Sequence, residues 1–187
     1  MKENEELKSF ITEMDHQMAS RSFRYFFVEI LGFLYNHHHE SWQKGLEESQ
    51  YFCVKASRDH GKSVFFMSYA LWLAAFNPGK HIMIFSHSLE QTLEHMRFIR
   101  NNIENSPVLR PLMPEGGRPW AKSYFEFTNG SRLMAKSVGG ATRGFHPDVV
   151  VCDDILWGTS GTELQRTADW FYGVLLPVLH HSSKLMM

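Results

Sequence analysis

The stretch Ala56-Ser57-Arg58-Asp59-His60-Gly61-Lys62-Ser63 decides the fold of this chain. It follows an apolar run at 51–54 and precedes a long helical pattern that begins at Val64. A strand, a tight loop ending in Gly-Lys-Ser and a helix together form a phosphate-binding loop, because N–H groups of the loop and of the helix N-terminus point at an anion. The lysine adds a positive charge, and the serine hydroxyl can hold Mg²⁺. The usual pattern is G-x-x-x-x-G-K-[ST], and its first glycine is replaced by Ala56, so the alternative is a chance Gly-Lys-Ser at a helix start.

A second element of a nucleotide site is the apolar run Val149-Val150-Val151-Cys152, which is followed by Asp153-Asp154. A short, β-branched, wholly apolar run is typical of a strand buried on both faces of a parallel sheet. Carboxylates at its C-terminal end lie where open α/β sheets bind ligands. We therefore predict an ATPase in which Asp153 holds Mg²⁺ through water and Asp154 orients or deprotonates the attacking water. The alternative for the pair alone is a strand end capped by turn-forming Asp residues.

Together the two motifs predict a specific geometry. The acidic strand should run parallel to the strand before the phosphate loop, in the same sheet. Asp153 should then face Ser63 within about 8 Å, close enough for one hydrated Mg²⁺ to link them.

The composition indicates one compact domain. The chain has 187 residues, of which 43% are apolar and 14% aromatic, enough for a core. Its formal net charge of −1 excludes a global basic field, so any contact with DNA would need local Lys/Arg clusters. Cys53 and Cys152 fall in predicted buried strands without metal-ligand spacing, which is typical of reduced core thiols. No apolar stretch reaches about 18 residues and the acidic N-terminus has no signal-peptide core, so we expect a cytoplasmic protein without a membrane span.

The pattern of hydrophobic residues predicts an alternation of helices and strands. Alternation of this kind is typical of a mainly parallel central sheet flanked by helices, here an α/β P-loop NTPase with a helical lead-in over 1–50 and an ATPase core over 51–187. Asn129-Gly130 between two apolar runs is a strong hairpin signal and predicts a β-hairpin insertion. The expected helices are 5–34 (with Leu7, Phe10, Ile11 and Met14 on one face), 39–48, 64–76, 89–104 and 164–179, and the expected strands are 51–56, 81–86, 124–128, 132–135 and 149–152.

The chain resembles a known family, the large terminase subunits that package DNA in tailed phages. The loop 57–63 is similar to the family's phosphate loop, which often lacks the first glycine and carries an arginine at the position of Arg58. The segment 140–148 resembles the approach to the family's acidic strand. Further similarities lie downstream in Glu163-x-x-Arg166, Asp169-Trp170-Phe171 and Leu175-Leu176-Pro177-Val178-Leu179. The resemblance covers roughly residues 38–179, and its combination of motifs is more specific than any one of them.

The resemblance implies roles for individual residues. Residues 56–63 would hold ATP, with Lys62 and Ser63 on the phosphates and Mg²⁺. Arg58 would reach the γ-phosphate and stabilise charge in the transition state, or else pair with Asp59 or another carboxylate. Arg143 would act as a finger on the ATP of a neighbouring subunit, or else be a solvated loop residue. The family usually ends its acidic strand with Asp-Glu, whereas Asp154 is one methylene shorter and would have to reach the water differently.

The adenine site is less defined by the sequence. His39-Glu40-Ser41-Trp42-Gln43 occupies the place of an adenine-contacting segment in the family. Trp42 would stack on the base and Gln43 would read its edge; the alternative is a core tryptophan and a solvated glutamine on an amphipathic helix. Three adjacent histidines at 37–39 cannot all face one metal ion from a regular element, so this run is predicted to be a polar loop or a helix start.

The resemblance also implies what is missing. Large terminases carry a nuclease domain with an acidic metal cluster after the ATPase. In this sequence the only acidic residues after Asp154 are Glu163 and Asp169. ATPases of this additional-strand (ASCE) class insert a further strand between the acidic strand and the phosphate-loop strand, and residues 183–187 resemble its beginning. We therefore expect an N-terminal piece that stops before the last strands of the ATPase core.

The sequence thus predicts the ATP-hydrolysing motor of a terminase, which moves double-stranded DNA into a capsid in the cytoplasm of an infected or lysogenic bacterium. The implied partners are double-stranded DNA, the portal, the small terminase subunit and further copies of the chain in a ring. One alternative is a catalytically incomplete fragment that binds nucleotide. Another is a different P-loop protein, such as a helicase-like ATPase or a nucleotide kinase, although no Arg-rich lid of a kinase is visible.

Overall fold

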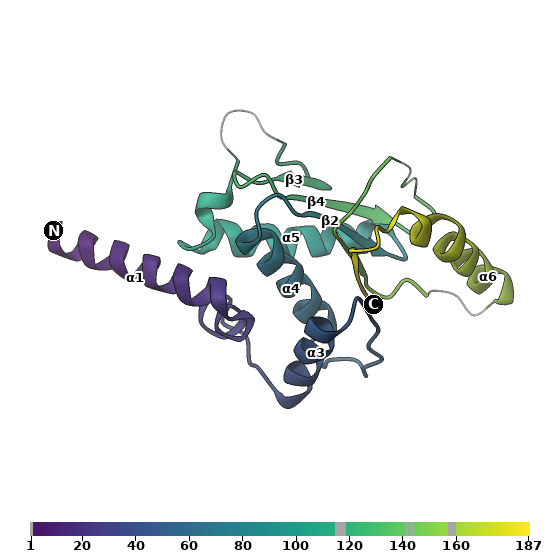
Figure 1. The fold of residues 1–187 in the computed structure, drawn as a ribbon, viewed down its shortest axis with the longest axis horizontal. Helices are drawn as coiled ribbons and strands as arrows, with labels where there is room; N and C mark the ends of the chain where they lie inside the picture. The colour runs from purple at the N-terminus through teal and green to yellow at the C-terminus, as the bar shows by residue number, and fades with distance from the viewer. Residues whose placement is uncertain (1, 115–118, 141, 143, 157–159) are drawn as a thin grey trace.

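A computed structural model describes residues 2–114, 119–140, 142, 144–156 and 160–187 (Figure 1). Its centre is a six-stranded sheet in the order β1-β6-β5-β2-β4-β3. All neighbouring strands are parallel except β3 and β4, which form the predicted antiparallel hairpin. The predicted α/β architecture is confirmed. The strands are β1 (Tyr51–Phe52), β2 (His81–Ser86), β3 (Tyr124–Glu126), β4 (Arg132–Ser137), β5 (Val149–Cys152) and β6 (Lys184–Met186).

Helices cover both faces of this sheet. On one face, α4 (Lys62–Phe76), α5 (Leu89–Asn105) and the N-terminal helices enclose the larger core, to which alternate residues such as Ile82 and Ile84 of β2 contribute. On the other face, α6 (Gly161–Trp170) and the helical turns η3 (Phe171–Leu175) and η4 (Leu176–Val178) enclose a smaller core. There the rings of Phe85 and Trp170 lie 5.1 Å apart.

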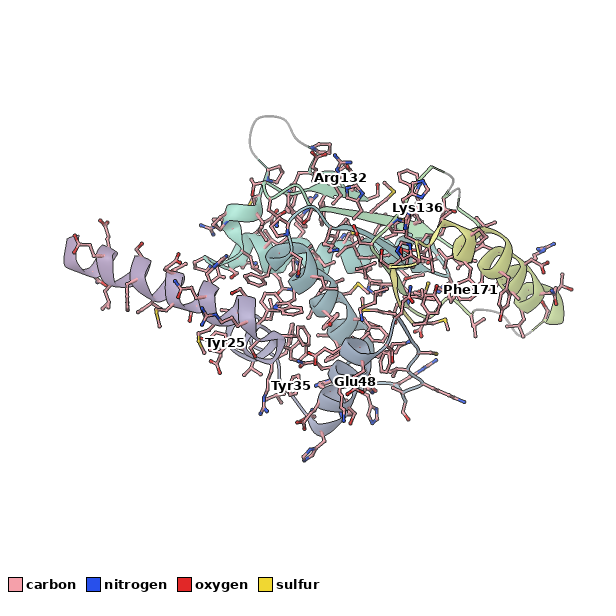
Figure 2. The ribbon with its side chains drawn as sticks, viewed as in Figure 1. Tyr25, Tyr35, Glu48, Arg132, Lys136 and Phe171 are labelled. Atoms are coloured by element: carbon pink, nitrogen blue, oxygen red, sulfur yellow. The ribbon has the colours of Figure 1, made fainter. Side chains whose placement is uncertain are left out.

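The predicted helix 5–34 is wrong in its length. Helix α1 (Lys2–Arg21) ends before Ser22, whose extended backbone and side chain cap the short helix α2 (Phe23–Tyr25), and the π-helical turn η1 (Phe26–Ile30) follows. This break redirects the chain, because Phe23, Phe26 and Phe27 can then enter the core. The hydroxyl of Tyr25 donates a 2.8 Å hydrogen bond to Asp15 where α1 meets α2 (Figure 2).

Helix α1 extends away from the body of the molecule (Figure 1). The predicted apolar face does exist, but it is exposed: Leu7, Phe10, Ile11 and Met14 each keep 45–62% of their surface. The helix contacts the body near its end instead, where Ala19 is buried and its carbonyl accepts a 2.8 Å hydrogen bond from Trp72. Among the described residues, no helix combines the length and apolarity needed to cross a membrane.

The strand before the phosphate loop is shorter than predicted. The ladder of β1 covers only 51–52 of the expected 51–56, and its partner is β6, with Tyr51 opposite Leu185 and Phe52 opposite Met186. Val54 N–H adds one bond to the carbonyl of Met187, at 2.6 Å. Because β1 is an outer strand of the sheet with one side open to solvent, Cys53 is exposed, and the prediction that both cysteines are buried is wrong. Cys152, in the centre of the sheet, is buried as predicted.

Strand β6 lies between β1 and β5, as the resemblance implied for residues 183–187. Lys184 fastens it to α3 (His37–Glu48): the ammonium group donates to the carbonyl of Leu46 and, at 2.8 Å, to that of Ser49. Burial lowers the pKa of Lys184. A charged group at the C-terminal end of α3 satisfies carbonyls that the helix itself leaves without partners.

The last predicted helix is α-helical over a shorter range than expected, and the turn of the predicted hairpin has a second role. The predicted helix 164–179 is α-helical only from Gly161 to Trp170, and the 3₁₀ turn η4 contains Pro177, which has no N–H to continue an α-helix. In the hairpin, Gly130 has φ +82 and Asn129 donates to the carbonyl of Ala74 at 2.8 Å, so the turn also caps the end of α4. A 3₁₀ turn, η2 (Arg110–Leu112), completes the described elements.

Candidate nucleotide-binding site

The phosphate loop ends in a backbone geometry that suits glycine. Gly61 has φ +72 and is the N-cap of α4, whose first residue is Lys62. A left-handed residue at this point turns the chain sharply, and only glycine adopts it without a steric penalty. Asp59 also has a positive φ, +65, in the exposed part of the loop. The loop thus presents the start of a 15-residue helix toward the C-terminal edge of the sheet.

Lys62 lies between two carboxylates. Its Nζ is 2.7 Å from Oδ1 of Asp154 and 3.1 Å from Oδ1 of Asp153, and its side chain is 18% exposed. Burial by itself lowers the pKa of Lys62, but the two carboxylates outweigh burial and hold the pKa above its usual value. The positive charge of Lys62 therefore offsets part of the negative charge of the acidic pair.

Asp153 is completely buried and contacts three side chains. Ser63 Oγ donates a 2.6 Å hydrogen bond to Oδ2, His95 Nε2 lies 3.1 Å from the same oxygen, and Lys62 faces Oδ1. Burial raises the pKa of Asp153, but His95, Ser63 and Lys62 more than compensate and lower it to about 2. The carboxylate is therefore ionised at neutral pH despite its burial. The predicted geometry is confirmed, because Ser63 and Asp153 are in contact and β1 and β5 run parallel to β6 between them.

Asp154 differs from its neighbour in both exposure and backbone. Its side chain is 62% exposed, and its φ is +49. Aspartate and asparagine tolerate the left-handed region better than longer or branched residues do. This backbone is a physical reason for Asp, rather than Glu, at the end of the strand. The short side chain reaches Lys62, and whether it also orients a water molecule stays a prediction.

The two predicted arginines have different positions. The Arg58 side chain lies in the exposed part of the loop, and within the described residues its guanidinium forms no ion pair with Asp59 or another carboxylate. The carbonyl of Arg58 is 3.1 Å from Nδ1 of His60. Arg143 lies outside the residues that the structure describes, so its predicted role stays a prediction.

The sequence predicted adenine contacts for Trp42 and Gln43 of α3, but it is another residue of α3, His38, that contacts the phosphate loop. Gln43 accepts from Tyr35 at 2.6 Å and donates to Glu47 at 2.7 Å, and Trp42 packs edge-on against Phe65 at 5.4 Å. His38 Nε2 instead lies 3.1 Å from the carbonyl of His60 in the loop.

His39 lies in the first turn of α3 and packs against α4. Its ring stacks on Phe65 at 5.2 Å, and burial and the neighbouring His38 lower its pKa. The imidazole Nδ1 accepts from Asn36 N–H at 3.2 Å, so the histidine run begins α3, as predicted. Among the described residues, no group of three or more His, Cys, Asp or Glu side chains is arranged to hold a metal ion.

His95 is the site residue that sequence reasoning missed. It lies on α5 between the buried positions Thr92 and Met96, and nothing in its local pattern marks it. Only the packing of α5 against the sheet brings it to Asp153.

A cavity of about 420 Å³ borders this cluster. Lys62 and Asp154 form part of its wall, together with Ala56 of the loop and Met187 beside β6. The donor set also suits Mg²⁺, because a hydroxyl and an ionised carboxylate in contact are hard oxygen ligands. Mg²⁺ takes its other ligands from water and phosphate, so a dedicated protein cage is not required.

Comparisons with known proteins find solved structures with a similar fold. Among solved structures, the large terminase of bacteriophage HK97 superposes with a TM-score of 0.62 at 13% identity, over 82% of this chain and 33% of that one. The ATPase domain of the Thermus phage P74-26 large terminase superposes with a TM-score of 0.59 at 15% identity, over 88% of this chain and 68% of that one. The fold is that of phage large terminase ATPase domains. The chain spans one third of the HK97 protein that it resembles. No protein-family model and no curated protein matches the sequence.

Proposed function

We propose that this chain is the ATP-hydrolysing part of a phage DNA-packaging motor, which converts ATP and water to ADP and phosphate. The observation that supports it most is the convergence of Lys62, Ser63, Asp153 and Asp154 at one edge of a terminase-like sheet. A lysine and a serine at the start of a helix bind phosphate. The two carboxylates would hold the metal and orient the attacking water, which hydrolysis also requires.

The contacts suggest how the site responds to nucleotide. Phosphate is a stronger partner for Lys62 than one exposed carboxylate, so binding would draw the ammonium group away from Asp154. Asp154 would then be free to orient or accept a proton from the attacking water. Arg58, exposed and without an ion pair among the described residues, is available to the γ-phosphate.

Ser63 and Asp153 would hold Mg²⁺, which neutralises charge on the β- and γ-phosphate oxygens when it is bound. Trp42 and Gln43 remain proposed contacts of the adenine, and Arg143 a proposed finger toward a neighbouring subunit. We further propose that residues 1–50 pack on an ATPase core of residues 51–187, and that the motor acts as a ring with double-stranded DNA, the portal and the small terminase subunit in the host cytoplasm.

The test is ATP hydrolysis by the chain, measured with and without double-stranded DNA, for the parent, Lys62→Ala and Lys80→Ala. Lys80 is a matched control, because it pairs with Asp148 at 3.3 Å at the opposite end of the strands. We expect hydrolysis by the parent and Lys80→Ala, stimulated by DNA, and none by Lys62→Ala. Nucleotide binding without turnover in the parent would instead support the catalytically incomplete alternative, and absence of nucleotide binding would contradict both.

A further inference from the structure

The surroundings of Asp153 contain one partner that the proposed function does not use. Lys62 and Ser63 both belong to the phosphate loop, and both would turn toward nucleotide or metal when these bind. His95 comes from α5, which is not part of the phosphate loop, and its side chain is 12% exposed. Its Nε2 lies 3.1 Å from Asp153 Oδ2, which is ion-pair distance without hydrogen-bond geometry, and within the described part of the chain Nε2 has no hydrogen-bond partner.

The position of His95 is fixed by the sheet. Asp153 N–H donates to the carbonyl of Phe85 at 2.9 Å, so the end of β5 is tied to the end of β2. Helix α5 follows β2 after a short turn, and Thr92 anchors it by donating to the carbonyl of Lys136 at 2.9 Å. Met96, beside His95, is fully buried. His95 is therefore held against Asp153 by two strands and a packed helix, none of which belongs to the phosphate loop.

Ligand binding would change the balance of charge around Asp153. If Lys62 and Ser63 move to the phosphates and the metal, the buried carboxylate loses two of its three contacts. The metal would then be a partner of Asp153, and His95 is the protein contact that remains to fix the orientation of the carboxylate. Carboxylates that ligate metals are commonly held by hydrogen bonds from a second layer of residues.

We propose that His95 is a positioning residue that holds the Asp153 carboxylate in its metal-binding orientation while the phosphate loop engages nucleotide. This inference rests on the proposed function. A purely structural role, in which His95 fills space between α5 and the sheet, would require its volume but not its nitrogen.

Two substitutions separate these roles. In His95→Gln the amide nitrogen can take the place of Nε2, whereas in His95→Asn it falls short by about one bond, although both residues are polar and similar in volume. His37→Asn is the control, because His37 is fully exposed at the start of α3. Binding of Mn²⁺ to the 187-residue chain, in the presence of a non-hydrolysable ATP analogue, can be followed by electron paramagnetic resonance. Affinity for the analogue alone is measured in EDTA.

We expect His95→Asn to weaken Mn²⁺ binding about tenfold or more, the range for loss of a second-layer partner, while His95→Gln and His37→Asn stay within about threefold of the parent. Affinity for the analogue in EDTA should be unchanged in all variants. Equal Mn²⁺ affinity in the parent and His95→Asn, or an equal loss in both His95 variants, would overturn the inference and leave the proposed function intact. A parent that binds neither the analogue nor Mn²⁺ would overturn the proposed function and the inference with it.

Discussion

Ser63 Oγ donates a 2.6 Å hydrogen bond to Asp153 Oδ2 across 90 residues of sequence. One residue belongs to the first turn of α4 and the other follows β5, which is separated from β1 by β6. The bond joins the phosphate loop to the acidic strand. The predictions below concern what this junction and its neighbours contribute.

Asp154→Asn should separate binding from hydrolysis. The substitution removes the charge that holds Lys62 at 2.7 Å, so the lysine becomes more available to phosphate. Because Asp154 is largely exposed, the pair is worth about 0.2–1 kcal/mol, and nucleotide affinity should rise by about 1.4- to fivefold. Hydrolysis should fall by about 10²–10⁴ if Asp154 is the general base. Calorimetric titration with nucleotide and steady-state turnover measure the two effects, and unchanged turnover at saturating ATP would exclude the base role.

Lys62→Met should weaken both nucleotide binding and the fold. The variant removes the phosphate contact and leaves the buried carboxylate of Asp153 with one fewer partner, which costs about 1–3 kcal/mol. Lys80→Met, at the ion pair with Asp148, should cost less than about 1 kcal/mol, because both of its side chains are 40% exposed. Urea unfolding of the parent and both variants compares the free energies directly. Equal losses would show that Lys62 does not stabilise the buried carboxylate.

Stability without added metal should fall in acid because of Asp153. Its pKa is lowered to about 2 in the folded chain, whereas an unfolded aspartate titrates near about 3.9. The contribution is therefore fully present above about pH 5 and is lost as the pH falls toward 2, with a size of about 2–3 kcal/mol. In Asp153→Asn this part of the pH dependence should disappear. Unfolding free energies measured between pH 6 and pH 2.5 in EDTA would contradict the assignment if the parent and the variant had the same slope.

Lys184→Met should loosen the attachment of β6. The ammonium group donates to the carbonyls of Leu46 and Ser49, and its loss leaves two acceptors at the end of α3 without this partner, at about 1–3 kcal/mol. Lys44→Met is the matched control on the same helix. Its exposed pair with Glu48, at 3.9 Å, should contribute less than about 0.5 kcal/mol. Chemical denaturation of the two variants tests the difference, and comparable midpoints would show that Lys184 is dispensable for the sheet.

Local patterns in the sequence determined the two motifs and most of the elements. The strand at His81–Ser86 has the predicted bounds, because a short apolar run before a helical repeat has few other interpretations. The hairpin follows from Asn129-Gly130, and the loop and acidic strand follow from residue types whose chemistry requires that order. The end of α1 before Ser22 was not predictable from the pattern of apolar residues, because the side-chain cap at Ser22 interrupts a helical pattern that continues through it.

Tertiary structure alone decided the places of β2, β4 and β3 in the strand order, the exposure of the apolar face of α1, and the partners of the acidic pair. Lys62 and Asp154 are 92 residues apart, and His95 reaches Asp153 only because α5 packs against β2 and β4. Periodicity reports which face of an element is apolar, but not which element covers it. The contacts that give Asp153 its low pKa come from two other segments, the start of α4 and α5, so they exist only once the sheet has formed.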